Sequence, residues 1–160
     1  MPVPVIRLAD LEDAADVAAL VRAVDLHYAG PDVARPIAPT IAMVEHSMRE
    51  AEGTRYALAF LDGRAVGLAC FALLRPGFRL TGLLFLKELF VDSSARGQEV
   101  GAALMQWLAA YAREQGLTRI DLTTEASNQG ARVFYERLGA EQKDKVFYRF
   151  NLSTDVLTDG

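Results

Sequence analysis

The sequence predicts a mixed α/β domain. Two apolar runs with strand character are joined by Asp62-Gly63, and Asp-Gly between apolar runs is a strong hairpin signal. Longer segments on either side repeat their apolar residues at helical spacing. No linker, repeat or low-complexity stretch interrupts the chain. We therefore expect a single domain over residues 1–160, with a folded core over 3–152 and a loose tail over 153–160.

The chain begins with a short strand and a capped helix. The apolar run Val5–Leu8 predicts the strand, and Asp10 is an N-cap for a helix that begins at Leu11, with Asp13 at the third helical position. The apolar residues of this helix share one face as far as Val24. A stretch with several prolines follows, and we interpret it as a loop over residues 25–39.

The central part predicts a second helix and then three strands. The helical pattern covers residues 40–51, and the hairpin strands cover 56–61 and 65–74. The almost wholly apolar run Leu83–Val91 predicts a buried strand. Two further helices are predicted over residues 100–115 and 129–138, and they stop before Gly116 and Gly139. Each is followed by a predicted strand, over residues 119–123 and 145–151.

Composition narrows the function classes. The net charge of -4 disfavours a nucleic-acid partner held through phosphate contacts. The one cysteine, Cys70, excludes an internal disulfide and a multi-cysteine metal site, and its apolar surroundings indicate a buried structural thiol. We expect no metal site. No signal segment precedes the first strand and no apolar run is long enough to cross a bilayer, so we expect a cytoplasmic protein without a membrane partner.

The segment from Arg96 to Ala103 carries the clearest functional signal. It joins a predicted strand to a predicted helix and contains Gly97 and Gly101. A glycine turn that opens a helix leaves outward-pointing N–H groups that can hold a phosphate or pyrophosphate. The nucleoside-triphosphate loop is excluded because no Gly-Lys-Ser or Gly-Lys-Thr is present, and the glycine spacing does not fit the dinucleotide fingerprint.

The turn resembles that of the GNAT N-acetyltransferase superfamily. The pattern [QR]-x-x-G-x-[GA] of that family is matched by Gln98-Glu99-Val100-Gly101-Ala102-Ala103. The preceding strand is similar as well, with the string Leu86-Lys87-Glu88-Leu89-Phe90-Val91-Asp92 followed by Arg96-Gly97. Downstream, a family helix pattern is matched by Asn128, Ala131, Phe134-Tyr135, Leu138 and Gly139-Ala140. One departure is Glu99, where many members have glycine.

The resemblance implies a fold and a cofactor. The fold is a central, mixed, mostly antiparallel twisted sheet of six to seven strands flanked by about four helices and splayed at the cofactor cleft. The cofactor is acetyl-CoA, with the turn amides on its pyrophosphate and a β-bulge near residues 88–90 that frees backbone groups for the pantetheine arm. The implied cofactor-binding residues are Leu89, Phe90, Val91, Arg96, Gly97, Gln98, Glu99, Val100, Gly101, Ala102, Ala103, Asn128, Phe134 and Tyr135.

Two side chains are candidates for catalysis. Glu88 is a carboxylate in an otherwise apolar strand and can remove a proton from the acceptor ammonium, directly or through water. The alternative is that Glu88 faces solvent or pairs with Lys87, and the bulge decides which of the two faces the cleft. By resemblance, Tyr135 lies near the departing sulfur and protonates it; the alternative is a packed aromatic residue.

The resemblance also implies an amine acceptor. The end of the first helix lines the acceptor side in this family, which makes Asp25, His27 and Tyr28 substrate-binding candidates together with Glu88. The strand string and the Phe-Tyr-Arg-Phe ending resemble the spermidine/spermine acetyltransferase-like branch. We therefore expect a small-molecule primary amine, such as a polyamine or amino acid, as acceptor, and a homodimer. A peptide or protein acceptor, or an acetyl-CoA-binding protein without catalysis, are the alternatives.

Overall fold

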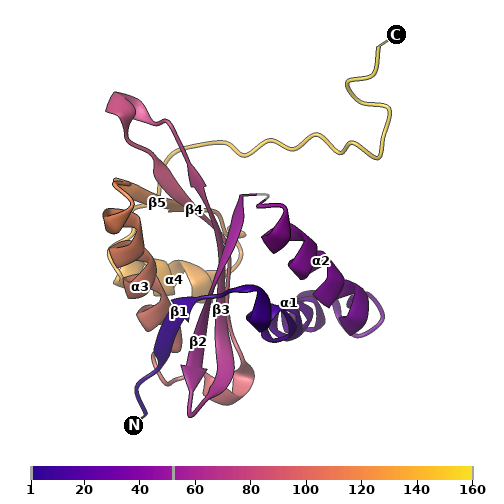
Figure 1. Ribbon diagram of the computed structural model, residues 1–160. Helices are drawn as coiled ribbons and strands as arrows, with labels where there is room; N and C mark the ends of the chain where they lie inside the picture. The colour runs from indigo at the N-terminus through magenta and orange to yellow at the C-terminus, as the bar shows by residue number, and fades with distance from the viewer. Residues whose placement is uncertain (1, 52, 160) are drawn as a thin grey trace. The chain divides into compact units, whose positions relative to one another are not determined.

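The computed structural model describes residues 2–51 and 53–159. These residues fall into two compact units that divide after Thr123. The first unit contains a five-stranded sheet with helices α1 (Ala14–Ala29), α2 (Ile37–Arg49) and α3 (Val100–Glu114), and the second contains helix α4 (Gln129–Arg137) (Figure 1). The mixed α/β class with four α-helices agrees with the prediction. That all residues form a single domain stays a prediction.

The sheet is mixed and mostly antiparallel, as predicted. Its strands lie side by side in chain order, and only the last pair is parallel. The predicted hairpin is present, since Asp62 and Gly63 both adopt positive φ, the conformation of the favoured two-residue turn. The strands are β1 (Val5–Leu8), β2 (Thr54–Leu61), β3 (Arg64–Leu74), β4 (Leu83–Val91) and β5 (Arg119–Leu122).

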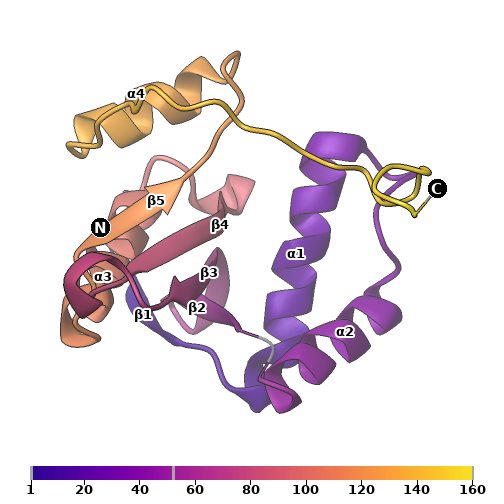
Figure 2. The same cartoon turned by 90° about the horizontal axis from the view of Figure 1, so that it is seen from above.

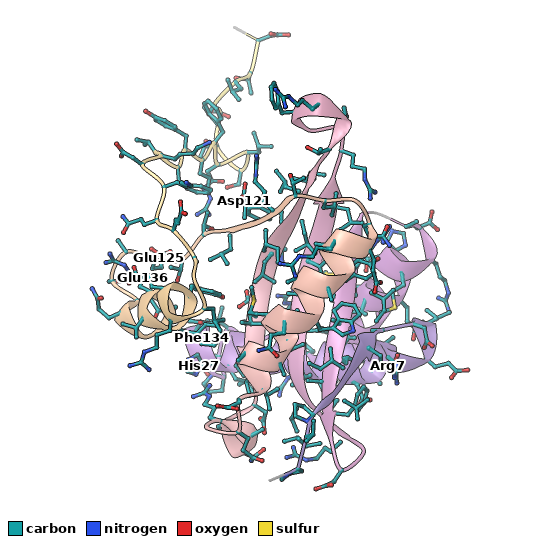
Figure 3. All side chains as sticks on the ribbon, turned by 90° about the vertical axis from the view of Figure 1, so that its left-hand side faces the viewer. Arg7, His27, Asp121, Glu125, Phe134 and Glu136 are labelled. Carbon is teal, nitrogen blue, oxygen red and sulfur yellow. The ribbon has the colours of Figure 1, made fainter. Side chains whose placement is uncertain are left out.

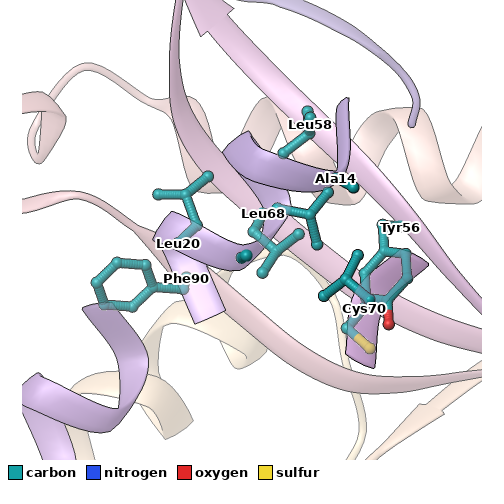
Figure 4. Close-up of a cluster of buried hydrophobic side chains, with 10 residues drawn as sticks. Ala14, Leu20, Tyr56, Leu58, Leu68, Cys70 and Phe90 are labelled. Atoms are coloured by element: carbon teal, nitrogen blue, oxygen red, sulfur yellow. The ribbon is translucent and has the colours of Figure 1, made fainter. Parts of the chain in front are cut away.

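Helices cover both faces of this sheet. Helices α1 and α2 pack on one face and α3 on the other, as Figures 1 and 2 show from two directions. The α1–α2 face is closed by a buried apolar cluster from α1, α2 and three strands (Figure 4). Its members are Ala14, Val17, Ala18, Leu20, Val44, Tyr56, Leu58, Leu68, Cys70 and Phe90.

The other face brings α3 very close to β3. An added Cβ on Gly67 would lie 2.9 Å from Cγ1 of Val100 and 3.0 Å from Cδ1 of Leu104. Further along, the ring of Phe71 lies 6.5 Å from Trp107 and 5.6 Å from Tyr111. The absent side chain at residue 67 therefore sets how closely the first turn of α3 approaches the sheet.

The first helix begins as the sequence indicates. Asp10 and Asp13 form a capping box, in which the amide of Asp10 donates to Oδ2 of Asp13 at 2.9 Å. Arg7 adds a bidentate pair to the Asp13 carboxylate at 2.6 and 2.8 Å. These contacts fix the entry of the chain from β1 into a short 3-10 turn and then into α1.

Three expectations differ from the structure. The loop predicted over residues 25–39 is shorter, because α1 continues to Ala29 and α2 already begins at Ile37. Pro39 lies in the first turn of α2, where a missing N–H costs nothing. The strand predicted over 145–151 is absent: residues 141–150 have no regular structure and are exposed. The sheet thus has five strands among the described residues, rather than six to seven.

Candidate functional site

The turn before α3 has the backbone form of an anion site. Gly97 and Glu99 adopt positive φ values of 79° and 60°, and α3 begins at the next residue. Within the described chain, the amides of Glu99, Gly101 and Ala102 donate no hydrogen bond, and the first capped amide is that of Ala103, which donates to the Glu99 carbonyl at 3.0 Å. Free amides at a helix N-terminus attract negative charge.

The side chains of the turn leave the N-terminus of α3 open. Glu99 is exposed and makes no capping hydrogen bond, so its carboxylate does not occupy the helix N-terminus. Arg96 donates from Nε to the Val91 carbonyl at 3.3 Å, and its guanidinium lies 6.0 Å from the Phe90 ring. These contacts hold a positive charge beside the turn, which favours a bound phosphate.

Strand β4 separates from β5 beside the turn. The parallel pairing runs from Leu83 opposite Arg119 to Leu86 opposite Leu122 and ends there. The rest of β4, from Lys87 to Val91, has only β3 as a neighbour among the described strands. On that edge the backbone of Leu89 and the amide of Val91 are open to an extended ligand, and that they bind a pantetheine arm stays a prediction.

A β-bulge lies at the same point. Glu88 pairs with Cys70 and Leu86 pairs with Phe71, which leaves Lys87 as the extra residue. The bulge thus lies one residue before the predicted interval of 88–90. Because side chains alternate between faces, one extra residue reverses the face of every later side chain in the strand.

The bulge places Glu88 on the α1–α2 face. Its neighbour Cys70 and the next residue on that face, Phe90, both belong to the cluster beneath α1, whereas Lys87 is exposed. Burial raises the pKa of the half-buried Glu88 carboxyl, the Lys87 charge lowers it, and the Asp25 charge raises it further. The structure therefore turns Glu88, and not Lys87, toward the end of α1.

The end of α1 brings further predicted residues to the same face. The imidazole of His27, labelled in Figure 3, lies 6.2 Å from the Phe90 ring and 4.8 Å from the Tyr28 ring. Asp25 is close enough for its charge to act on Glu88. Tyr28 is 65% exposed. Asp25, His27 and Glu88 thus gather on one side of the sheet, and Tyr28 borders this group.

Arg35 is a member of this group that sequence reasoning missed. Its Nε and Nη2 donate to the two Asp25 carboxylate oxygens at 2.8 and 3.1 Å, which lowers the pKa of Asp25. Arg22 holds the same segment by donating to the Arg35 carbonyl at 3.1 Å. These contacts fasten the segment between α1 and α2 onto α1. No motif marks Arg35, because its partner lies in another element.

Cys70 is a buried thiol, as predicted. Burial raises its pKa to about 11, which keeps it protonated at neutral pH. The thiol therefore belongs to the buried cluster next to Glu88 and is not a nucleophile.

The second unit contains the other predicted residues. Asn128 caps α4, since its Oδ1 accepts from the Ala131 amide at 3.1 Å. Phe134, labelled in Figure 3, and Tyr135 follow on the same helix, with ring centroids 5.1 Å apart. Asn128 therefore fixes the start of α4, and the cofactor role of Asn128 and the roles of Phe134 and Tyr135 stay predictions.

Two kinds of site are not found in the described residues. No group of three or more His, Cys, Asp or Glu side chains is arranged to hold a metal ion there. In the same residues, no helix is long and apolar enough to span a bilayer.

Comparison with known proteins places the chain among acetyltransferases. Residues 20–140 match the Acetyltransferase (GNAT) family. An N-acetyltransferase of Methanocaldococcus jannaschii whose function is not known is 33% identical over 87 residues, 54% of this chain and 38% of that protein. The aminoalkylphosphonate N-acetyltransferase of Salmonella typhimurium is 30% identical over 87 residues, 54% of this chain and 56% of that protein. The aligned part thus spans about half the length of these relatives or less.

A solved structure extends the similarity to most of the chain. An integron cassette protein from the mobile metagenome of V. cholerae has a TM-score of 0.86 and 30% sequence identity, over 92% of each chain.

Proposed function

The chain belongs to the acetyltransferase (GNAT) family, and from this premise we propose that it is an acetyl-CoA-dependent N-acetyltransferase that acetylates the primary amine of a small molecule. The observation that carries the proposal is the junction of β4 with α3. Free amides at the start of α3 follow directly on a strand edge that β5 has left. The free amides suit a diphosphate, and the free strand edge suits an extended chain with amide groups.

The residues of the first unit fit coenzyme A at this junction. The free amides of Glu99, Gly101 and Ala102 hold the pyrophosphate, whereas the Ala103 amide, also expected to do so, already donates to the Glu99 carbonyl. Arg96 adds a positive charge, and the backbone of Leu89 to Val91 pairs with the pantetheine arm. Glu99 carries a carboxylate where many members have glycine, but it is exposed, so water screens its repulsion of a bound diphosphate. When bound, acetyl-CoA supplies the acetyl group as a thioester.

Glu88 acts as the base in this proposal. An amine with a pKa near ~10.4 is almost wholly protonated at neutral pH and cannot attack a carbonyl. Glu88 takes one proton from the ammonium, directly or through a water molecule, and burial favours this role because it raises the pKa of the carboxyl toward that of the acceptor. The amide N–H of Leu89, next in the strand, faces the thioester oxygen and stabilises the charge that develops there.

Tyr135 completes the transfer as the acid. The amine nitrogen bonds to the acetyl carbon, the carbon–sulfur bond breaks, and the Tyr135 hydroxyl protonates the departing thiolate. Asn128 and Phe134 lie on the same helix and contact the pantetheine arm. Both substrates are bound together, so the acetyl group passes directly from one to the other.

The acceptor side is formed by Asp25, His27, Tyr28 and Glu88. The half-buried Glu88 carboxylate favours a cationic amine over a neutral one, while Asp25 is already paired with Arg35. The name of the Salmonella typhimurium relative specifies a small amine, which supports a small-molecule acceptor such as a polyamine or amino acid. We further propose a homodimer, and a reducing cytoplasm as its location, since the single cysteine is free.

A thiol-release assay over a panel of amines tests this function. We expect coenzyme A release with at least one polyamine or amino acid, and calorimetric heat with coenzyme A in preference to ATP or NAD. Tyr135→Phe is expected to lower kcat about 100-fold with the affinity for coenzyme A unchanged. Tyr111→Phe, the same change on α3 against β3, is the control.

Three outcomes would contradict the proposal. Binding of ATP or NAD in preference to coenzyme A would contradict the cofactor. Cofactor binding without release for any amine or peptide would indicate a protein that binds without transferring. Release with peptides alone would replace the small acceptor with a protein N-terminus or lysine.

A further inference from the structure

We propose that the acceptor carries an acid group, a carboxylate or phosphonate, in addition to its amine, and that Arg96 and His27 bind this acid group beside Glu88. The proposal rests on the proposed acetyl transfer and names the class of acceptor for it, which is an amine of the amino acid type and not a polyamine. The contacts that carry it all lie within the first unit, between the end of α1, strand β4 and the turn before α3.

The ring of Phe90 is the point at which these elements meet. Phe90 and Glu88 face the same side of β4, the side covered by α1 and α2. They are two residues apart, which corresponds to about 6.6 Å along a strand. The imidazole of His27 lies 6.2 Å from the Phe90 ring, and the Arg96 guanidinium lies 6.0 Å from it. Two nitrogen-bearing side chains thus border the ring that follows Glu88 on this face.

Arg96 has hydrogen-bond donors left for a ligand. Its Nε donates to the Val91 carbonyl at 3.3 Å, and its side chain donates no other hydrogen bond within the described residues. This contact holds the guanidinium in place and leaves Nη1 and Nη2 without an acceptor there. The N–H groups of a guanidinium lie in one plane and match two oxygens of a carboxylate or phosphonate.

His27 adds a further donor at the same ring. Its imidazole contacts the Tyr28 and Phe90 rings, and neither ring nitrogen has a hydrogen-bond partner in the part of the chain that the structure describes. Even a neutral imidazole carries one N–H that can donate to an anion. Arg96 and His27 therefore supply donors for an acid group, whereas Glu88 supplies an acceptor for an ammonium.

A polyamine matches this group poorly. Asp25 is the second carboxylate whose charge acts on Glu88, but both of its oxygens accept from Arg35, at 2.8 and 3.1 Å. A second ammonium would have to compete with Arg35 for Asp25, and it would also be repelled by the Arg96 charge. An amine with an acid group instead meets an opposite charge at each of its ends.

A matched series of amines tests the acceptor class by coenzyme A release. One, two or three methylene groups separate the amine nitrogen from an end group, which is a carboxylate, a phosphonate, a methyl or an ammonium. At the length that fits best, we expect kcat/KM for an acid end group to exceed that for a methyl about 100-fold, with the ammonium no better than the methyl. A methyl or ammonium end group that serves as well as the acid at every length would overturn the proposal.

Titration calorimetry of the same amines separates this inference from the proposed reaction. The protein is titrated with and without saturating coenzyme A, which has no acetyl group to transfer. Tighter binding of the acid-bearing amines without any release from acetyl-CoA would support the acceptor class and contradict the transfer. Acetylation of amines without a preference for the acid group would support the transfer and contradict the acceptor class.

Variants of the two donors test their roles. Arg96→Gln is expected to lower the acid-to-methyl ratio of kcat/KM about 100-fold, through the KM of the acid-bearing amine, and Arg96→Lys to restore part of it. His27→Phe keeps a ring against Phe90 without nitrogen atoms and is expected to lower the ratio about tenfold. A change in cofactor binding affects both amines alike, so the ratio reports on the acceptor. Arg49→Gln, at an exposed pair on α2, is the control and keeps the ratio. An unchanged ratio in Arg96→Gln would show that this side chain does not bind the acid group, and the proposal would be wrong.

Discussion

At the scale of the residue, Glu88 owes its position to one extra residue in its strand. Without the bulge at Lys87, regular alternation would turn Glu88 to the same face as Leu86, against α3. With the bulge, Glu88 lies beside Cys70 and near the end of α1, where burial and the Asp25 charge raise its pKa. The sequence shows a carboxylate in an apolar run, but the bulge depends on pairing with β3, which no local pattern reveals.

This environment predicts the pH dependence of catalysis. Glu88 must be ionised to accept a proton, so kcat/KM falls as the pH falls through its pKa. Because burial raises that pKa, the acid limb of the profile lies above the usual carboxyl value of ~4.3. Glu88→Gln is expected to remove this limb and lower kcat about 100-fold or more. Glu114→Gln, an exposed control on α3, keeps the wild-type profile, and a Glu88→Gln enzyme with an unchanged acid limb would exclude Glu88 as the base.

The same pKa shift predicts an effect on stability with a definite sign. A carboxyl whose folded pKa is raised binds protons more tightly when folded, so the free energy of unfolding decreases as the pH rises from its unfolded to its folded pKa. Glu88→Gln removes the cost of ionising a carboxyl group in this half-buried position. We expect the variant to be more stable than the wild type at neutral pH and to lose that advantage below about pH 4. Urea unfolding at both pH values measures the difference, and a variant less stable at neutral pH would contradict it.

At the scale of the element, α3 depends on how closely it approaches β3. The Gly67 position leaves no room for a side chain beneath the first turns of the helix. Gly67→Ala is expected to cost about 1–3 kcal/mol of stability, because overpacked side chains must shift. Since the shift falls on Val100, next to the free amides, the Kd for coenzyme A should rise as well.

Urea unfolding and titration calorimetry measure these two effects. Gly130→Ala in α4 is the matched control, because the nearest atom to an added Cβ there is 3.8 Å away. An unchanged Kd in the folded Gly67→Ala protein would show that the turn does not rely on this contact.

The elements themselves were predicted where their signals are local. The local signals were the helical spacing, the Asp10 cap and the Asp62-Gly63 turn. Each depends on residues close together in the sequence, and each is present in the structure. The start of α2 was missed because Pro39 suggested a loop, although the first turn of a helix tolerates proline. Strand formation at 145–151 requires a partner strand, and pattern alone does not supply one.

At the scale of the whole molecule, the sheet brings the end of α1 to the middle of β4. The cofactor turn could be predicted because it is one continuous motif, from Gln98 to Ala103. The acceptor side joins Asp25, Arg35 and Glu88 from separate elements, and only the resemblance to a family pointed to part of it. Arg35 was missed because an ion pair between elements leaves no periodic signal.

The Arg35–Asp25 pair predicts a selective kinetic effect. Arg35→Gln removes the bidentate contact that fastens the segment between the two helices. We expect the KM for the amine to rise about tenfold while the KM for acetyl-CoA stays the same, since the turn before α3 is not touched. Arg49→Gln, which breaks an exposed pair with Glu45 on α2, is the control. Equal increases in both KM values would instead indicate general loosening of the fold.

The single cysteine gives this protein a built-in reporter of its own motion. With a pKa of about 11, the Cys70 sulfur is ionised in only about one molecule in ten thousand at pH 7, and the folded chain shields it from reagents. Alkylation with iodoacetamide can therefore proceed only as often as the helical layer lifts from the sheet. The labelling rate, followed by mass spectrometry with and without an amine, measures how firmly an acceptor holds the helical layer against the sheet.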